Sequence, residues 1–167
     1  MNYSDRLGLW ATDAHEYFID KAFPNLAPAI RDIIKAGSAY ADKPSYQTAE
    51  FAYMHAMSSE LLNAGQAREK MCDFIKTHLR EAEDAKRAGT GHHWFHLGMA
   101  LHAVMDSTSP AHEGFQMWHG VRRDGRRHGP WPSSLENINV AKQPFHTKRT
   151  LERMQEAMKG ELGACGC

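Results

Sequence analysis

The sequence predicts an all-α fold, a single-domain bundle of five to six helices with a long irregular loop at about residues 113–143. Apolar residues recur at intervals of three and four along most of the chain, which is the period of a helix with one buried face. No stretch alternates apolar and polar residues as a half-buried strand does, and no internal repeat is present. A chain of 167 residues fits one domain that can bury a core without extra cross-links.

The first half of the chain predicts four helices separated by turn residues. The first begins with Thr12 or Asp13 as its N-cap and ends before Pro24, because proline cannot continue a helix. A turn at 42–45 and the glycines at 89 and 91 mark two further boundaries. The predicted helices therefore span about residues 12–23, 26–41, 47–63 and 66–87.

The second half predicts an apolar helix from residue 92 that stops before Pro110, and an amphipathic helix at about 145–159. Between them, from residue 113 to 143, the helical period is lost and Gly, Pro, Trp and Arg dominate. Loops of this length in compact domains are usually functional or disordered.

Composition excludes several classes of protein. The formal net charge is zero, so no overall basic field predicts nucleic-acid binding, although arginines make the 122–127 stretch basic. No apolar run approaches 18 residues, so neither a membrane span nor a signal peptide is expected. The three cysteines, Cys72, Cys165 and Cys167, lack the spacing of a metal or disulfide framework, and the tail is expected to fray.

Eleven histidines are the conspicuous excess, and two observations bear on their role. His102 and Asp106 are one helical turn apart, so both side chains can reach one cation; the alternative is a core histidine hydrogen-bonded to a carboxylate. The chain has no His-Glu-x-x-His, Glu-x-x-His or Gly-x-Ser-x-Gly motif. What remains is histidine and aspartate on helices, the ligands that zinc prefers where thiolates are absent.

The spacing around this helix resembles that of the bacterial zinc-dependent phospholipases C. An aromatic residue, Leu-Gly, His-x3-Asp, and Pro-x-His follow one another with every interval of that family kept. The single-strand-specific zinc nucleases share the helix. Four other features match in order: Trp10-x4-His15, an aspartate, a histidine thirteen residues later, and Phe-His-Thr-Lys near the last helix. The matched residues are Trp10, His15, Asp42, His55, Phe95, Leu97, Gly98, His102, Asp106, Pro110, His112 and His146.

The resemblance implies two to three zinc ions and a role for each matched ligand. One zinc would be held by Asp42, His55, His102 and Asp106, a second by His112 and His146, and a third by His15, the α-amine of Trp10 and a bridging Asp106. Asp42 would also be the catalytic base beside the attacking water. The family has a carboxylate four residues after its last histidine, where this chain has Thr150. Glu136, His119 and His128 are the candidates to replace that carboxylate.

The leader resembles a second family. Residues 3–9, Tyr-Ser-Asp-Arg-Leu-Gly-Leu, are similar to the Asp-Pro-x-Gly-Leu motif that closes the shell of rearrangement hot spot (Rhs) proteins, with Arg6 in place of proline. Such shells cleave themselves after this leucine and free a toxin. The resemblance implies that residues 1–9 end the shell, that cleavage between Leu9 and Trp10 creates the α-amine ligand, and that 10–167 is the toxin domain. Its expected partners are the parental Rhs shell and a cognate immunity protein, with delivery into a target cell as a monomeric effector.

The resemblance implies a zinc-dependent phosphodiester hydrolase, of phospholipase C type, that acts on a phospholipid membrane. The aromatic-Leu-Gly spacing and the lack of disulfide cysteines favour this substrate. Aromatic and Met side chains of the loop would either enter the membrane surface or fold back onto the core. One alternative is a nuclease toxin on single-stranded DNA or RNA, and another is a non-enzymatic helical domain with structural histidines. The loop residues concerned are Phe115, Met117, Trp118 and Trp131, and the histidines not expected to be ligands are His78, His92, His93 and His96.

Overall fold

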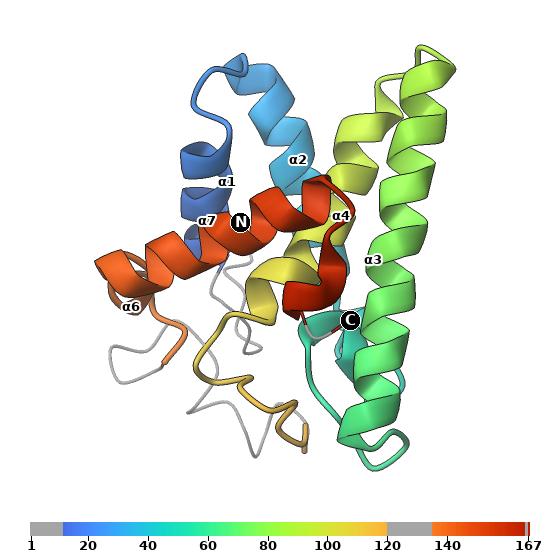
Figure 1. Ribbon diagram of the computed structural model, residues 1–167, viewed down its shortest axis with the longest axis vertical. Coiled ribbons are helices and arrows are strands. Elements are labelled where there is room, and N and C mark those ends of the chain that lie inside the picture. Colours follow the sequence, from blue (N-terminus) through green and yellow to red (C-terminus); the bar gives the residue numbers. More distant parts are fainter. Residues whose placement is uncertain (1–11, 120–134, 166) are drawn as a thin grey trace.

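The computed structural model describes residues 12–119, 135–165 and 167, and these residues form a helical bundle (Figure 1). Within those ranges there are short 3-10 helices and one isolated bridge, between Ser58 and Met117, but no strand. The all-α fold class is therefore confirmed. The α-helices are α1 (Thr12–Ala22), α2 (Pro28–Ala41), α3 (Ala64–Arg87), α4 (His92–Asp106), α6 (Ile138–Ala141) and α7 (Pro144–Met158), and the 3-10 helices are η1 (Pro44–Tyr46), η2 (Ala52–His55) and η3 (Leu162–Cys165).

Helix α4 lies at the centre of the bundle. It packs along α2 and α3 and also contacts α1, η2 and α7, which crosses in front of it in Figure 1. Every residue from Gly98 to Asp106 is buried, so this half of α4 has no solvent face. His102 and Asp106 consequently lie in the interior, whereas the first turn of α4 is exposed or half-buried.

Two glycines let the backbones of α2 and α4 touch. A Cβ added at Gly37 would lie under 3.0 Å from the backbone oxygen of Phe95, and one added at Gly98 would lie as close to the backbone oxygen of Ile34. In both cases the added Cβ would meet backbone atoms of the other helix, and these cannot move aside by a side-chain rotation. This close approach places Ser38 of α2 against His102 of α4.

The helix boundaries follow local sequence signals. Pro28 occupies the first turn of α2, where its missing N–H costs nothing. At α3, the Asn63 side chain accepts a hydrogen bond from the Gln66 N–H while the Gln66 side chain accepts one from the Asn63 N–H. This capping box satisfies two backbone donors that a helix start leaves unpaired.

The predicted helix at 47–63 is wrong. This segment forms η2 and a series of turns, and Ala56 has a left-handed backbone with φ of 53°. Residues 54–59 are all buried, which a peripheral helix with one buried face cannot achieve. Ser58 instead pairs with the chain after α4, accepting from Trp118 N–H at 2.8 Å and donating to Gln116 O at 3.1 Å.

The cysteines and the long loop also differ from expectation. Cys72 of α3 is bonded to Cys167, so the tail is tied down rather than frayed, and the C-terminus lies beside α3 in Figure 1. The loop predicted at 113–143 contains α6 near its end, and Phe115 and Trp118 pack against the core. Among the described residues, none of the helices has the length and hydropathy to span a membrane.

Candidate metal centre

Five of the predicted ligands meet inside the bundle. They come from different parts of the chain: α1, the residue that caps the end of α2, η2, and two positions of α4. All five side chains are at least nine-tenths buried. The residues are His15, Asp42, His55, His102 and Asp106.

Three ligand atoms of this group form a close triangle, and Asp42 lies at its edge. His55 Nδ1 lies 3.0 Å from His102 Nε2 and 3.3 Å from Asp106 Oδ2, and His102 Nε2 lies 3.1 Å from the same oxygen. Asp42 Oδ1 is 3.5 Å from His102 Nε2 and 3.9 Å from His55 Nδ1. A tetrahedral zinc ion with bonds of about 2.0–2.1 Å has ligand atoms about 3.3–3.4 Å apart. The three close atoms therefore fit three corners of a tetrahedral cation site in type and spacing, and Asp42 lies farther out.

The triangle of His55, His102 and Asp106 cannot consist of three hydrogen bonds. An ionised carboxylate only accepts, and each imidazole nitrogen either carries a proton or does not. With a proton on both nitrogens, the two N–H groups oppose each other at 3.0 Å. With one proton, the other nitrogen meets the carboxylate lone pair to lone pair. A cation at the centre would turn all three contacts into favourable ones.

Asp106 uses its two oxygens in different directions. Oδ2 faces His55 and His102, whereas Oδ1 lies 3.0 Å from His15 Nε2. The other nitrogen of His15, Nδ1, is 3.8 Å from Asp42 Oδ2. Asp106 therefore contacts the ligand triangle with one oxygen and His15 with the other.

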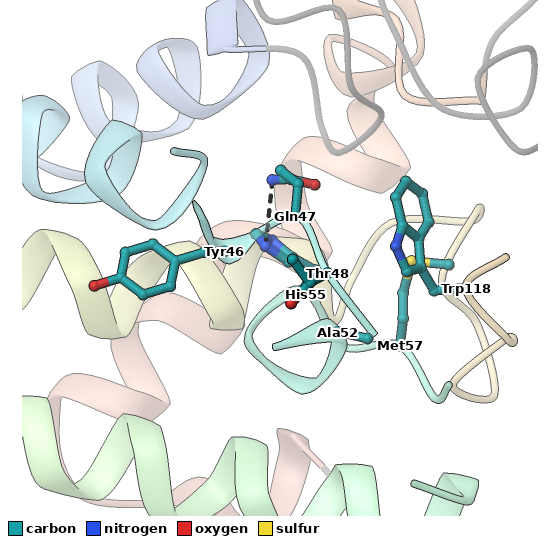
Figure 2. Close-up of a pocket in the computed structure, with 7 residues that line it drawn as sticks. All are labelled: Tyr46, Gln47, Thr48, Ala52, His55, Met57 and Trp118. Atoms are coloured by element: carbon teal, nitrogen blue, oxygen red, sulfur yellow. Dashed lines mark hydrogen bonds between the residues drawn. The ribbon is translucent and has the colours of Figure 1, made fainter. Parts of the chain in front are cut away.

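Polar side chains behind the ligands orient the imidazoles. Ser38 Oγ lies 3.3 Å from His102 Nδ1 and can accept its N–H, which leaves Nε2 free to ligate. The Gln47 amide nitrogen lies 3.4 Å from His55 Nε2 (Figure 2) and 3.4 Å from Asp42 Oδ1. For His55 to ligate through Nδ1, the amide must turn its oxygen towards Nε2 and accept the proton there. Neither role has a local sign in the sequence, because both partners lie on other elements.

Charge at the centre suits a cation. Burial lowers the pKa of His102 to about 3, with His15 and His55 adding to the effect and Asp106 opposing it. Burial raises the pKa of Asp106, but its contacts with His102 and His15 outweigh this and hold that pKa well below its ordinary value. A neutral imidazole and an ionised carboxylate are the forms that bind metals.

His112 forms a separate buried pair. Its Nε2 lies 2.6 Å from Glu136 Oε1, and both side chains are fully buried. Burial lowers the pKa of His112, but Glu136 and Asp106 outweigh it and raise the pKa above its ordinary value. Glu136, a candidate to replace the carboxylate that the family has at the position of Thr150, is thus in contact with His112. Thr150 is buried and hydrogen-bonds Thr108 at 2.8 Å.

The remaining predicted site residues that the structure describes do not belong to the central group. His146 is half-buried in the first turn of α7 with its ring beside Phe145, and burial together with Arg149 lowers its pKa. Within the described ranges it joins no set of three potential ligands. His119 is exposed. Leu9, Trp10, His128 and Trp131 lie outside the described residues.

A small hollow opens beside the centre at His55 (Figure 2). It leaves ≈ 0 Å³ for a water-sized molecule, so no ligand fits there without movement of the lining side chains. Trp118 covers one side and is 7% exposed, and Phe115 is 8% exposed, so both have folded onto the core. Of the described side chains expected to reach a membrane, Met117 alone is exposed, at 49%. The lining residues are Tyr46, Gln47, Thr48, Ala52, His55, Met57 and Trp118.

No protein-family model, curated protein or solved structure matches this chain. The geometry and the fold define it as an all-α domain with buried His and Asp groups that could hold a metal ion.

Proposed function

We propose that this chain is a metal-dependent phosphodiester hydrolase and that its metal is zinc. The observation that carries the proposal is the convergence of His55, His102 and Asp106 at spacings that suit three corners of a tetrahedral cation site, which leaves the fourth corner for water. Imidazole and carboxylate without thiolate is a donor set that suits zinc, whereas magnesium prefers oxygen ligands alone.

Each of these side chains would have a distinct role in such a reaction. His55, His102 and Asp106 hold the first cation, and the second oxygen of Asp106 extends the site towards His15. Zinc supplies a Lewis acid for the phosphodiester oxygens and lowers the pKa of bound water towards 7. Asp42, at the edge of the group with oxygens towards both sides, is placed to accept the proton of the attacking water.

A phospholipid is the proposed substrate, and the support is the resemblance of the α4 motif to the zinc-dependent phospholipases C. Two features of the structure weaken this choice of substrate. The disulfide between Cys72 and Cys167 removes the argument from missing disulfide cysteines. Gly98 of the Leu-Gly pair is explained by its contact with α2, a packing role that any substrate would permit.

The disulfide favours a second candidate, a nuclease acting on single-stranded DNA or RNA. It removes a difference between this chain and the zinc nucleases, which share the ligand helix. Both candidates use one phosphodiester chemistry, so the metal centre alone does not separate them.

Parallel assays separate the candidates. Zinc-loaded protein is incubated with phosphatidylcholine vesicles and with single-stranded DNA and RNA, and released phosphate ester or cleaved strand is measured. Asp106→Asn and His102→Gln should each lower the rate at least about a hundredfold, since they remove a metal ligand. His92→Gln, an exposed histidine of the same helix, is the matched control. Full activity in both ligand variants, or the absence of stoichiometric zinc, would contradict the proposal and favour a helical domain whose histidines are structural.

The delivery proposal rests on the resemblance of the leader to the Rhs shell motif. It makes this domain a toxin released after Leu9, with a cognate immunity protein as its partner. Mass spectrometry of toxin released from its full-length parent should find Trp10 as the first residue. Any other terminus would contradict both the cleavage and the role of the Trp10 amine.

A further inference from the structure

A second group of potential ligands lies outside the central site, between α3 and α4. His78 Nδ1 and His96 Nδ1 are 3.1 Å apart, and Glu81 Oε2 lies 2.9 Å from the first and 3.0 Å from the second. The three atoms therefore form a nearly equilateral triangle. The sequence analysis placed both histidines outside any metal site; His96 lies six residues before His102 and was expected to face elsewhere on the helix.

The protons available cannot satisfy this triangle. Glu81 can accept from both rings, but the two Nδ1–H groups would then face each other at 3.1 Å. If one ring gives up its proton, its nitrogen and the carboxylate oxygen repel across the remaining edge. A cation in the middle needs only small outward movements, from about 3.0 Å to the roughly 3.3 Å edge of a tetrahedral zinc site.

The group is open to solvent and well separated from the central site. The side chains of His78, Glu81 and His96 are 17%, 43% and 28% exposed, so an ion can enter and a water can complete its coordination. His96 precedes His102 by six residues, which is about 9 Å along a helix axis. The ring of His78 is fixed by edge contact with Phe74 at 4.5 Å between centroids.

We propose that His78, Glu81 and His96 form a second binding site for a divalent transition-metal ion such as zinc, which links α3 to α4. Two imidazoles and one carboxylate with an open fourth position are a donor set that zinc accepts. Partial exposure and three protein ligands make this ion weaker and faster to exchange than one in the buried centre. The site goes beyond the proposed hydrolase activity and needs none of its residues.

The test is the zinc stoichiometry of the intact chain, measured by equilibrium dialysis and elemental analysis. His96→Gln, Glu81→Gln and His78→Gln should each bind one ion fewer than the wild type, with affinity for that ion lowered at least about tenfold. His92→Gln is the control, because it removes an exposed histidine one turn before His96 in α4. This variant should bind as many zinc ions as the wild type. Circular dichroism checks that each variant remains helical.

Repeating the measurement in a variant of the central site distinguishes a failure of this proposal from a failure of the proposed function. The Asp106→Asn variant should lose the zinc of the central site but keep the ion held by His96. The double variant with Asp106→Asn and His96→Gln should lose both ions. If Asp106→Asn changes nothing while His96→Gln loses an ion, the central proposal fails and this one stands. If Glu81→Gln, His78→Gln and His96→Gln all bind as many ions as wild type, the three side chains are an interhelical hydrogen-bond cluster and the proposal is overturned.

Discussion

Asp106 contacts three imidazoles through two different oxygens and is completely buried. Burial disfavours its charge, but the contacts with His102 and His15 outweigh this and lower its pKa. Its effect on stability should therefore depend on whether metal is present.

Asp106→Asn keeps the shape of the side chain and removes its charge. With metal chelated, the variant should be the less stable protein, because the lowered pKa of Asp106 means that the fold favours its ionised form. In a His96→Gln background, which lacks the proposed second site, zinc at a thousand times its dissociation constant should add about 4 kcal/mol, or roughly 10 °C, to the protein with Asp106 and little to the Asp106→Asn protein. Thermal unfolding with zinc and with chelator measures both quantities. An equal zinc-dependent shift in the two proteins would mean that Asp106 is not a ligand.

Ser38 would affect a bound metal ion through its contact with His102. Ser38→Ala removes the hydroxyl that can accept the His102 Nδ1–H, and the loss of such a partner typically lowers metal affinity 10–100-fold. Competition with a chromophoric chelator measures this change. Ser107→Ala is the matched control, because Ser107 donates to a carbonyl of α4 and touches no ligand. Equal affinities for the two variants would show that Ser38 does not orient the imidazole.

At the scale of elements, the pairing of α2 and α4 depends on Gly37 and Gly98. Gly98→Ala should destabilise the fold by about 1–3 kcal/mol or more, because the added Cβ meets the backbone of α2 and the helices must separate. Urea unfolding measures the loss. Gly65→Ala is the control: its Cβ has only Asn63 Oδ1 nearby, at 3.4 Å, and alanine suits a helix better than glycine. A Gly98→Ala protein as stable as wild type would contradict the close approach.

Local patterns predicted elements well where one face of a regular helix is buried. The periods of α2, α3 and α7 gave their bounds to within a few residues, and Pro24 correctly marked the end of α1. The same periodicity failed at 47–63, because apolar residues there are buried on all sides by turns and by the chain at 116–118. A run of apolar residues cannot reveal which of these environments surrounds it.

The residues of the candidate site differ in how far the sequence predicts them. The spacing of His102 and Asp106 predicts by itself that both lie on one side of a helix. His15, Asp42 and His55 were singled out through the family resemblance, and the fold brings them to the same place. Ser38 and the triangle around Glu81 left no signal, since they depend on how whole helices pack.

At the scale of the whole molecule, the disulfide joins residues that are 95 positions apart. Closing a loop of about 100 residues restricts the unfolded chain, and native disulfides commonly contribute about 2–4 kcal/mol. Cys167→Ser, at an exposed position, should lower the free energy of unfolding by about this amount. Urea unfolding of the variant and of reduced wild type checks it. An unchanged midpoint after reduction would mean that the tail is held by other contacts.

The same bond has a topological consequence. It closes a covalent ring that contains α4 and α7, and thus His102, Asp106, His112 and His146. A ring cannot pass single file through a channel that admits only one extended strand. Any transport of this domain through such a channel therefore requires a reduced chain, and oxidation on the far side would lock the transported protein into its folded form.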